Sequence, residues 1–382
     1  MNGTSGPAPN NAVQSTEYGI PIRNLWYMLL YAWNEYPITK DWSMEDVEAA
    51  PTLDALLAAI LSKLIQQRMR IGLGRAYIDH HQAIQGIRGR LDFTESLKRR
   101  TFDHGQAFCE FQQFSANSQK NQIIRSTLAR LVQVGNFGAD QQRADELRHN
   151  LRRLTRALDD IDLIELKLDL IRRQQFGRND GDYRLMMAIC GLILERQMPT
   201  EATGWHHLPA LNRQALILHK VYESFVANFY RLHLRHYSVK AQSHLSWNTR
   251  KENAFLPIMK PDLILQEKRT GEMIVLDTKF TAKSLSENLW GKQLFDSSHL
   301  YQMYAYLHTQ ESLSVQHHKA AGVLLYPAIH GKLSEQIEWE NHIIGVESLD
   351  LAVQWEEIEK RLFEIVDTYH PSRSLNYHSD QG

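Results

Sequence analysis

The feature that most constrains the fold is a pair of short apolar runs, residues 262–266 and 273–280, joined by a polar turn that contains Gly271. Runs of this length on either side of such a turn predict two adjacent antiparallel strands. The second run is unusual, because Asp277 and Lys279 follow an Ile-Val-Leu segment directly. Charged side chains inside an apolar strand are costly unless they are paired or bind a ligand. The hairpin is therefore expected to carry a site as well as part of a core.

Alternation along the strand brings three charged groups of this hairpin together. Residues two apart share one face of a strand, so Asp277 and Lys279 project to the same side, and the turn folds Asp262 back toward them. Two carboxylates beside an ammonium are the groups that metal-assisted phosphodiester hydrolysis requires. We expect the carboxylates to hold Mg²⁺, with the Thr278 carbonyl as a further ligand, and the lysine to position the attacking water or help to deprotonate it. The alternative is an exposed hairpin in which an aspartate and the lysine form a simple ion pair.

Two predicted helices flank the hairpin and carry further candidate residues. The first, residues 212–236, is amphipathic and contains Glu223, which either completes the metal site or is an ordinary surface glutamate. The second, residues 299–308, carries Gln302 and Tyr306 four residues apart and hence on one helix face. This Gln-x-x-x-Tyr pattern is similar to that of RecB-like nucleases, where it lines the site near DNA.

An apolar run at residues 321–326 predicts one more strand after the second helix. The order helix, strand, strand, helix, strand is that of a PD-(D/E)xK core. The predicted fold class is α/β (α+β), with a mixed N-terminal domain of helices and short strands before a C-terminal restriction-endonuclease-like PD-(D/E)xK core. We expect a flexible tail over residues 1–18, an N-terminal α+β partner-binding region over 19–205 and the nuclease domain over 206–382.

The N-terminal region shows a mixed pattern of periodicities. Helical spacing predicts helices, and short alternating runs predict strands. The expected helices cover residues 25–33, 53–70, 117–134, 144–158 and 182–197, and the expected strands cover 77–84, 87–93 and 107–114. A dense basic cluster lies beside these strands and consists of Arg88, Arg90, Lys98, Arg99 and Arg100. It predicts a compact basic projection over residues 75–115 that contacts either a partner protein or nucleic-acid phosphates.

Composition excludes several classes of protein. Lys plus Arg number 43 and Asp plus Glu number 44, so the chain lacks an overall basic surface for gripping nucleic acid. Two cysteines cannot form a disulfide framework, and the adjacent histidine pairs direct their side chains apart, so neither predicts a zinc centre.

No stretch approaches the ~18 apolar residues of a membrane span, and the first residues lack a secretory signal. The expected location is cytoplasmic, and the chain shows no nucleotide-binding motif of its own.

Several segments together resemble the McrC family, the nuclease subunits of McrBC modification-dependent restriction systems. The resemblance covers nearly the whole chain from Ile20. The segments that carry it, besides the Asp-x-Lys hairpin, are residues 20–33, 86–93, 300–302 with Tyr306, and 322–327.

This resemblance implies an endonuclease that cleaves DNA carrying modified cytosine with the help of Mg²⁺. It also implies a partner, an McrB-like AAA+ GTPase hexamer whose hydrolysis the chain stimulates, and double-stranded DNA as substrate. The pattern leaves two alternatives open. One is a stand-alone PD-(D/E)xK nuclease of DNA repair type, and the other is a non-catalytic scaffold that activates the NTPase.

Overall fold

The computed structural model describes residues 19–35, 50–177, 180–197, 210–249, 253, 255–280, 285–287 and 293–370. The expected tail over residues 1–18 and the expected boundary between residues 205 and 206 lie outside the described residues. The chain divides into two compact units, one of residues 50–201 and the other of residues 1–49 with 202–382. In the described part of the chain, no helix combines the length and the apolar composition that a bilayer crossing requires.

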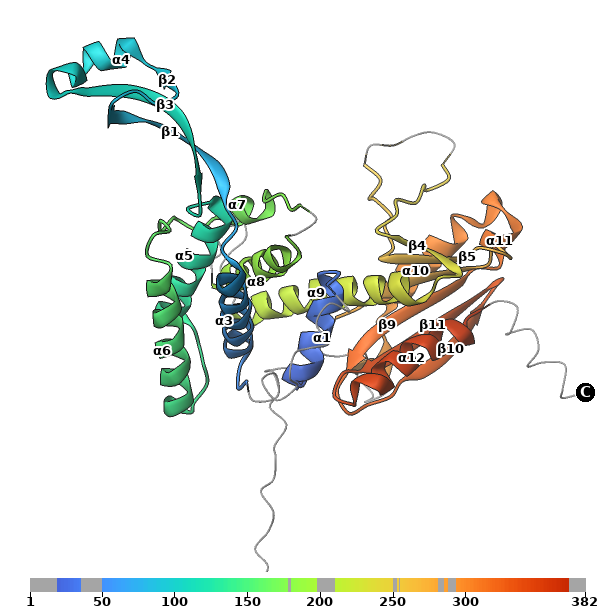
Figure 1. Cartoon of the computed structure of the whole chain (residues 1–382). Helices are drawn as coiled ribbons and strands as arrows, with labels where there is room; N and C mark the ends of the chain where they lie inside the picture. The colour runs from blue at the N-terminus through green and yellow to red at the C-terminus, as the bar shows by residue number, and fades with distance from the viewer. Residues whose placement is uncertain are drawn as a thin grey trace, which may run out of the picture. The chain divides into compact units, whose positions relative to one another are not determined.

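The C-terminal unit is built on a mixed sheet with the strand order β10-β11-β9-β6-β5-β4 (Figure 1). Its central strands β6, β9 and β11 are parallel to one another, and the other pairings are antiparallel. The strands are β4 Tyr237–Ala241, β5 Leu263–Glu267, β6 Met273–Thr278, β9 Ala321–Ala328, β10 Ser334–Trp339 and β11 His342–Asp350, and β7 Leu285–Glu287 pairs separately with β8 Gln293–Phe295. The helices of this unit are α1 Ile22–Ala32, α9 Ala210–His233, α10 Ser297–His308, η2 Glu311–Leu313, α11 Val315–His318 and α12 Trp355–Thr368.

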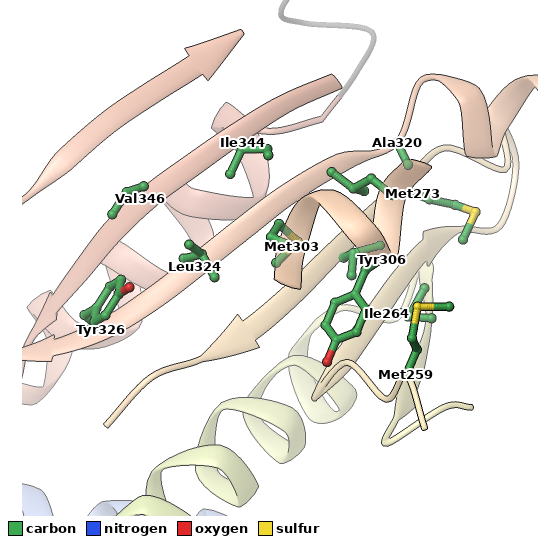
Figure 2. Packing of buried hydrophobic residues seen from close by; sticks show 12 residues of the cluster. Met259, Ile264, Met273, Met303, Tyr306, Ala320, Leu324, Tyr326, Ile344 and Val346 are labelled. Carbon is green, nitrogen blue, oxygen red and sulfur yellow. The ribbon is translucent and has the colours of Figure 1, made fainter. Parts of the chain in front are cut away.

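One face of the sheet packs against α10. Met303 of α10 lies against Leu324 of β9 and against Ile344 and Val346 of β11, and Figure 2 shows these side chains in one cluster. Gly322 belongs to this contact, since a Cβ atom there would lie 2.7 Å from Met303. Close approach of helix and sheet therefore depends on a residue without a side chain.

The register of the hairpin places Asp277 on the face that α10 covers. Val275 pairs with Ile264 on one side and with Gly322 on the other, and Asp277 lies one pleat further along and pairs with Leu324. Residues two apart share a face, so the charged end of β6 points toward the same helix as the apolar cluster.

The first helix, α1, belongs to the C-terminal unit, so the predicted domain boundaries need correction. The amide of the buried residue Asn24 donates to the carbonyl oxygens of Leu351 and Val353, both at 2.8 Å. Tyr31 packs against Phe225 of α9, with ring centroids 5.6 Å apart. The apolar pattern around α1 indicated a buried helix, but periodicity does not say which distant segment covers it.

The unit of residues 50–201 consists of a helical body and an arm of strands and short helices (Figure 1). The body contains α3 Leu53–Ile71, α5 Gln119–Val134, α6 Gln141–Ala157, α7 Leu168–Arg172 and α8 Gly181–Gln197. The arm contains β1 Ala76–Gln85, β2 Arg90–Leu91, α4 Phe93–Lys98, η1 Thr101–His104 and β3 Gln106–Ser115, with β3 between β1 and β2. The predicted α/β (α+β) class is confirmed, since both units mix helices with strands.

The strand predicted over residues 87–93 is wrong for most of its length. Only Arg90–Leu91 pairs with β3, and Phe93 already begins α4. Gly89 has a φ of 70°, and a Cβ atom there would lie 2.3 Å from the Glu110 carbonyl oxygen, so the chain turns at this point. Asp92 then caps α4 by accepting a hydrogen bond from the Glu95 N–H at 2.9 Å, which ends the strand.

Candidate active site

Asp262 is held in a fixed orientation just before β5. Its Oδ2 atom accepts hydrogen bonds from the Thr278 N–H at 2.8 Å and from the Thr278 hydroxyl at 2.6 Å. The backbone and side chain of a residue on β6 thus fix a carboxylate of the neighbouring strand, as the folded hairpin requires. The Thr278 carbonyl, which the sequence suggested as a metal ligand, stays a prediction.

Lys279 lies beside Asp277 and is held there by α10. Its ammonium forms an ion pair with Asp277 Oδ2 and donates to Gln302 Oε1 at 2.6 Å. The Gln302 amide in turn donates to the Tyr306 hydroxyl at 2.7 Å. The tyrosine ring belongs to the apolar cluster between α10 and the sheet (Figure 2), so this chain of contacts ends in the core.

Glu223 of α9 is linked to Asp262 through a residue that the sequence interpretation missed. The Gln242 amide nitrogen donates to Glu223 Oε1 and lies 3.3 Å from Asp262 Oδ1. Gln242 follows β4 with a φ of 54°, which is uncommon for a residue other than glycine. A single glutamine after a short strand belongs to no recognisable sequence pattern. Only the fold shows that Gln242 connects Glu223 with Asp262.

The pKa values of Asp277 and Glu223 are both raised. Burial, and then the charge on Asp262, raise the pKa of Asp277, while Lys279 acts in the opposite direction. The same two causes raise the pKa of Glu223 to about 7. Burial and the nearby Asp277 charge raise the pKa of Tyr306 to about 12, so this hydroxyl keeps its proton at neutral pH. Such shifts are frequent where several acids are gathered for binding or catalysis.

These residues fit a hard divalent cation. Asp262, Asp277 and Glu223 offer oxygen atoms alone, which is the donor type that Mg²⁺ prefers. Repulsion among them and burial penalise their ionised forms, and a dication among them would remove that penalty. The structure thus brings together the carboxylates, the lysine and the Gln-Tyr pair that the sequence singled out, and their roles remain predictions.

A histidine–tyrosine pair at the edge of this site was also missed. His299, in the first turn of α10, lies with its Nδ1 atom 2.8 Å from the Tyr326 hydroxyl on β9. Burial, then the Asp296 charge and then the Asp277 charge raise the pKa of Tyr326 to about 12. Burial and then the Lys279 charge lower the pKa of His299. Tyr326 looked like the end of an apolar strand in the sequence, so its polar end drew no prediction.

The basic projection expected over residues 75–115 is corrected by the structure. Within the arm, residues 76–115, the five basic side chains are accompanied by five acidic ones, Asp79, Asp92, Glu95, Asp103 and Glu110. Lys98 and Arg99 both pair with Glu95, and Arg90 lies 3.6 Å from Glu110. The guanidinium of Arg88 lies over the Phe111 ring at 4.6 Å. The arm is therefore balanced in charge.

Exposed apolar side chains are the more distinctive feature of the arm. Four large ones lie around β2, α4 and η1: Ile87 is 71% exposed, Phe93 58%, Leu97 57% and Phe102 40%. We call these four residues the apolar tip. Large apolar side chains exposed together are typical of a surface that meets a partner.

Comparison with known proteins identifies the family of this chain. Residues 10–327 match the model of a family described as McrBC 5-methylcytosine restriction system component. The chain belongs to this family. The match includes the hairpin and the Gln302–Tyr306 pair, and it begins before Ile20, where the sequence resemblance was placed.

Similar proteins of the McrBC family agree with this assignment. "Type IV methyl-directed restriction enzyme EcoKMcrBC" of Escherichia coli (strain K12) is 26% identical over 354 residues, which cover 92% of this chain and 98% of that protein. The fold is similar to a chain in a structure of Thermococcus gammatolerans, a refined half-complex from a tetradecameric assembly of McrB AAA+ hexamers with bound McrC. That match has a TM-score of 0.55 and 17% identity, and it covers 91% of this chain and 76% of the other. It supports the fold.

Proposed function

We propose that this chain is the Mg²⁺-dependent DNA endonuclease subunit of a McrBC-type restriction system. The observation that carries the proposal is the convergence of Asp262, Asp277 and Glu223 with Lys279 at one end of a mixed sheet. The family and its restriction-enzyme relative supply the biological context. The proposed substrate is double-stranded DNA that carries methylcytosine or a similar modified base.

Each residue of the site has a distinct task in this proposal. Asp262 and Asp277 would hold the cation, with Glu223 completing the oxygen set. When bound, Mg²⁺ neutralises charge on the scissile phosphate and lowers the pKa of a coordinated water. Contacts with Asp277 and Gln302 hold the Lys279 ammonium in one position. It can therefore orient the attacking water and the phosphate without a further loss of side-chain entropy.

The proposed partner is an McrB-like AAA+ GTPase hexamer. The solved structure that shares this fold holds McrC together with McrB AAA+ hexamers. The apolar tip offers a contact surface of the required kind, because its side chains are exposed, while Arg90, Lys98 and Arg99 form ion pairs within the arm. We therefore place the partner contact of the arm on its apolar tip, where the sequence had suggested the basic cluster.

An assay on modified plasmid DNA tests the whole proposal. The purified chain is mixed with its AAA+ partner, GTP and Mg²⁺, and cleavage is compared between plasmids with and without 5-methylcytosine. We expect double-strand cleavage of the methylated plasmid that requires both proteins and is lost when EDTA replaces Mg²⁺. Cleavage by the chain without partner or nucleotide would instead favour a stand-alone nuclease. Stimulated GTP hydrolysis without any cleavage would favour the scaffold alternative.

A further inference from the structure

A second group of metal-binding side chains lies in the C-terminal unit, at the far end of α10. It consists of His308 in the last turn of α10, Glu311 in η2 and Glu340 in the turn between β10 and β11. One ligand atom from each of the three lies within 4.8 Å of the others. These segments are distant in the sequence, and the fold brings them to one place.

The spacing of these atoms suits a shared ion better than direct hydrogen bonds. His308 Nδ1 lies 3.5 Å from Glu311 Oε2 and 3.8 Å from Glu340 Oε2. Both distances exceed a normal N–H···O hydrogen bond, and a single ring nitrogen faces two carboxylates. Ligands of a tetrahedral zinc ion are separated by roughly 3.3–3.5 Å, given metal–ligand bonds of about 2.0–2.2 Å. The distance from His308 to Glu311 matches this spacing, and the distance from His308 to Glu340 exceeds it by a few tenths of an ångström.

A buried histidine fixes the central carboxylate. The His342 side chain is 0% exposed, and its Nδ1 lies 2.7 Å from the Ala320 carbonyl oxygen. A carbonyl oxygen and a carboxylate oxygen only accept, so both ring nitrogens donate, Nδ1 to Ala320 and Nε2 to Glu311 Oε1 at 2.9 Å. Glu311 is therefore held through one oxygen by His342 and presents the other to His308. Support of a ligand by a hydrogen-bonded neighbour is the usual construction around protein-bound metals.

Aromatic side chains hold the other two ligands. The Tyr304 ring stacks on the His308 ring, with centroids 5.1 Å apart and an angle of 11° between planes. The Tyr304 hydroxyl donates to Glu340 Oε2 at 3.0 Å, and the same ring stacks on Trp339. His308 and Glu340 are about half exposed, so an ion can reach them from solvent.

This group is separate from the proposed catalytic site. Gln302 and Tyr306, which face Lys279, precede Tyr304 and His308 by two residues each. Two residues correspond to roughly 200° around an α-helix, so the two pairs lie on opposite sides of α10. An ion bound to His308 would not replace the catalytic one.

We propose that His308, Glu311 and Glu340 bind a structural transition-metal ion of the zinc class, with water as the fourth ligand. His342 acts as a positioning residue for Glu311. The ion ties the end of α10 to the turn between β10 and β11, and α10 is the helix that carries Gln302. The mixed nitrogen and oxygen set favours Zn²⁺ or Co²⁺ over Mg²⁺, which prefers oxygen alone.

Cobalt binding to the tag-free full-length chain tests the proposal. Co²⁺ is added to the wild type, and its visible absorption reports a tetrahedral site. We expect one saturable tetrahedral equivalent, which Zn²⁺ displaces. The double variant Asp262→Asn with Asp277→Asn should keep this signal, because it alters only the catalytic carboxylates. His81→Gln should also keep it, and this variant controls for the His81, Asp92 and Glu110 group of the arm.

The double variant His308→Gln with Glu340→Gln should lose the tetrahedral signal, and Zn²⁺ should no longer raise its melting temperature. Both residues are exposed enough for the variant to fold, which its metal-free melting temperature verifies. His342→Gln should weaken Co²⁺ binding by about tenfold or more. A wild type without tetrahedral Co²⁺, or a His308/Glu340 variant that binds Co²⁺ like the wild type, would overturn the proposal.

Discussion

Lys279 is fixed from two sides, by an ion pair with Asp277 and by a hydrogen bond from its ammonium to Gln302. A charged lysine has no lone pair for a metal, so its role concerns the water and the phosphate. We expect Lys279→Ala to lower cleavage by about 100-fold or more while Mg²⁺ affinity is retained. The control is Lys268→Ala, in the exposed turn at the other end of the hairpin. If the Lys279 variant loses Mg²⁺ affinity as far as Asp262→Ala does, the assigned role is wrong.

Glu223 makes the stability of the metal-free protein depend on pH. Burial and the Asp262 charge raise its pKa from 4.5 to about 7 in the folded state. Between these values the folded state binds more protons than the unfolded state, so the free energy of unfolding falls as pH rises from about 4.5 to about 7. Above about pH 7, titration of Glu223 no longer changes the free energy of unfolding. Mg²⁺ affinity should rise across the same range, because the ion binds the ionised carboxylates.

The check is the melting temperature of the EDTA-treated protein between about pH 5 and pH 8. Glu223→Gln should be less dependent on pH than the wild type, since glutamine does not titrate. The raised pKa of Asp277 acts in the same direction in both proteins, so the comparison isolates Glu223. Equal pH dependence in the two proteins would show that Glu223 is not the group responsible.

At this scale, the sequence was informative where a residue broke a local pattern. Asp277 and Lys279 were recognisable because charge interrupts an apolar strand. Gln242 was not, because its importance comes from lying between Glu223 and Asp262, which are distant in the sequence. The same holds for His342, whose partners Glu311 and the Ala320 carbonyl are also remote in the chain.

Among the secondary-structure elements, α10 connects the core to the site. Gly322 on β9 lets it approach the sheet, since a Cβ atom there would lie 2.7 Å from Met303 and 3.0 Å from Leu307. We expect Gly322→Ala to destabilise the fold by about 1–3 kcal/mol through overpacking. The displaced helix should also weaken the contact of Gln302 with Lys279 and lower cleavage.

Thermal melting and the cleavage assay together check this prediction. Gly331→Ala is the matched control, because a Cβ atom at that exposed loop position meets nothing within 4 Å. It should leave both the melting temperature and the cleavage rate unchanged. A Gly322 variant with a lower melting temperature but full cleavage would show that the position of α10 does not matter to the site.

Elements with strong periodicity were predictable, and elements defined by tertiary pairing were not. The helix expected over residues 53–70 is observed as α3, Leu53–Ile71. The strands β10 and β11 were not predicted. β10 is largely exposed and alternates weakly in the sequence, and β11 is held by its pairing with β9 and β10. β2 pairs with β3 only over Arg90–Leu91, because the chain turns at Gly89 just before them. Residue propensities alone do not show this turn, so they predict too long a strand.

For the whole molecule, we propose separate tasks for the two units, with cleavage by the C-terminal unit and partner contact through the arm of the other. We expect Phe93→Ala combined with Leu97→Ala to reduce stimulated GTP hydrolysis by the partner severalfold, measured without DNA. Both side chains are more than half exposed, so their loss should not unfold the arm. Val134→Ala, at an exposed apolar position of the helical body, is the control.

Charge reversal at Arg88 and Arg90 separates the apolar tip from the basic cluster. We expect it to affect GTP hydrolysis less than the loss of Phe93 and Leu97. If hydrolysis is unchanged in all these variants while DNA affinity falls and depends less on salt, the arm binds phosphates and not the partner.

Domain organisation was predictable only in part. The sequence predicted a boundary between residues 205 and 206, but it did not predict the return of α1 to the C-terminal unit. That return depends on Asn24 bonding to carbonyls of Leu351 and Val353, far along the chain. Such contacts leave no local signal.

The Asp277→Asn variant, assayed for cleavage and for partner stimulation in the same reaction, tests most directly whether this site cuts DNA. We expect that cleavage of methylated DNA is lost, while complex formation and stimulated GTP hydrolysis equal those of the wild type. Removing a buried carboxylate whose pKa is raised should not destabilise the metal-free fold. Cleavage at the wild-type rate by this variant would contradict the assignment of the active site.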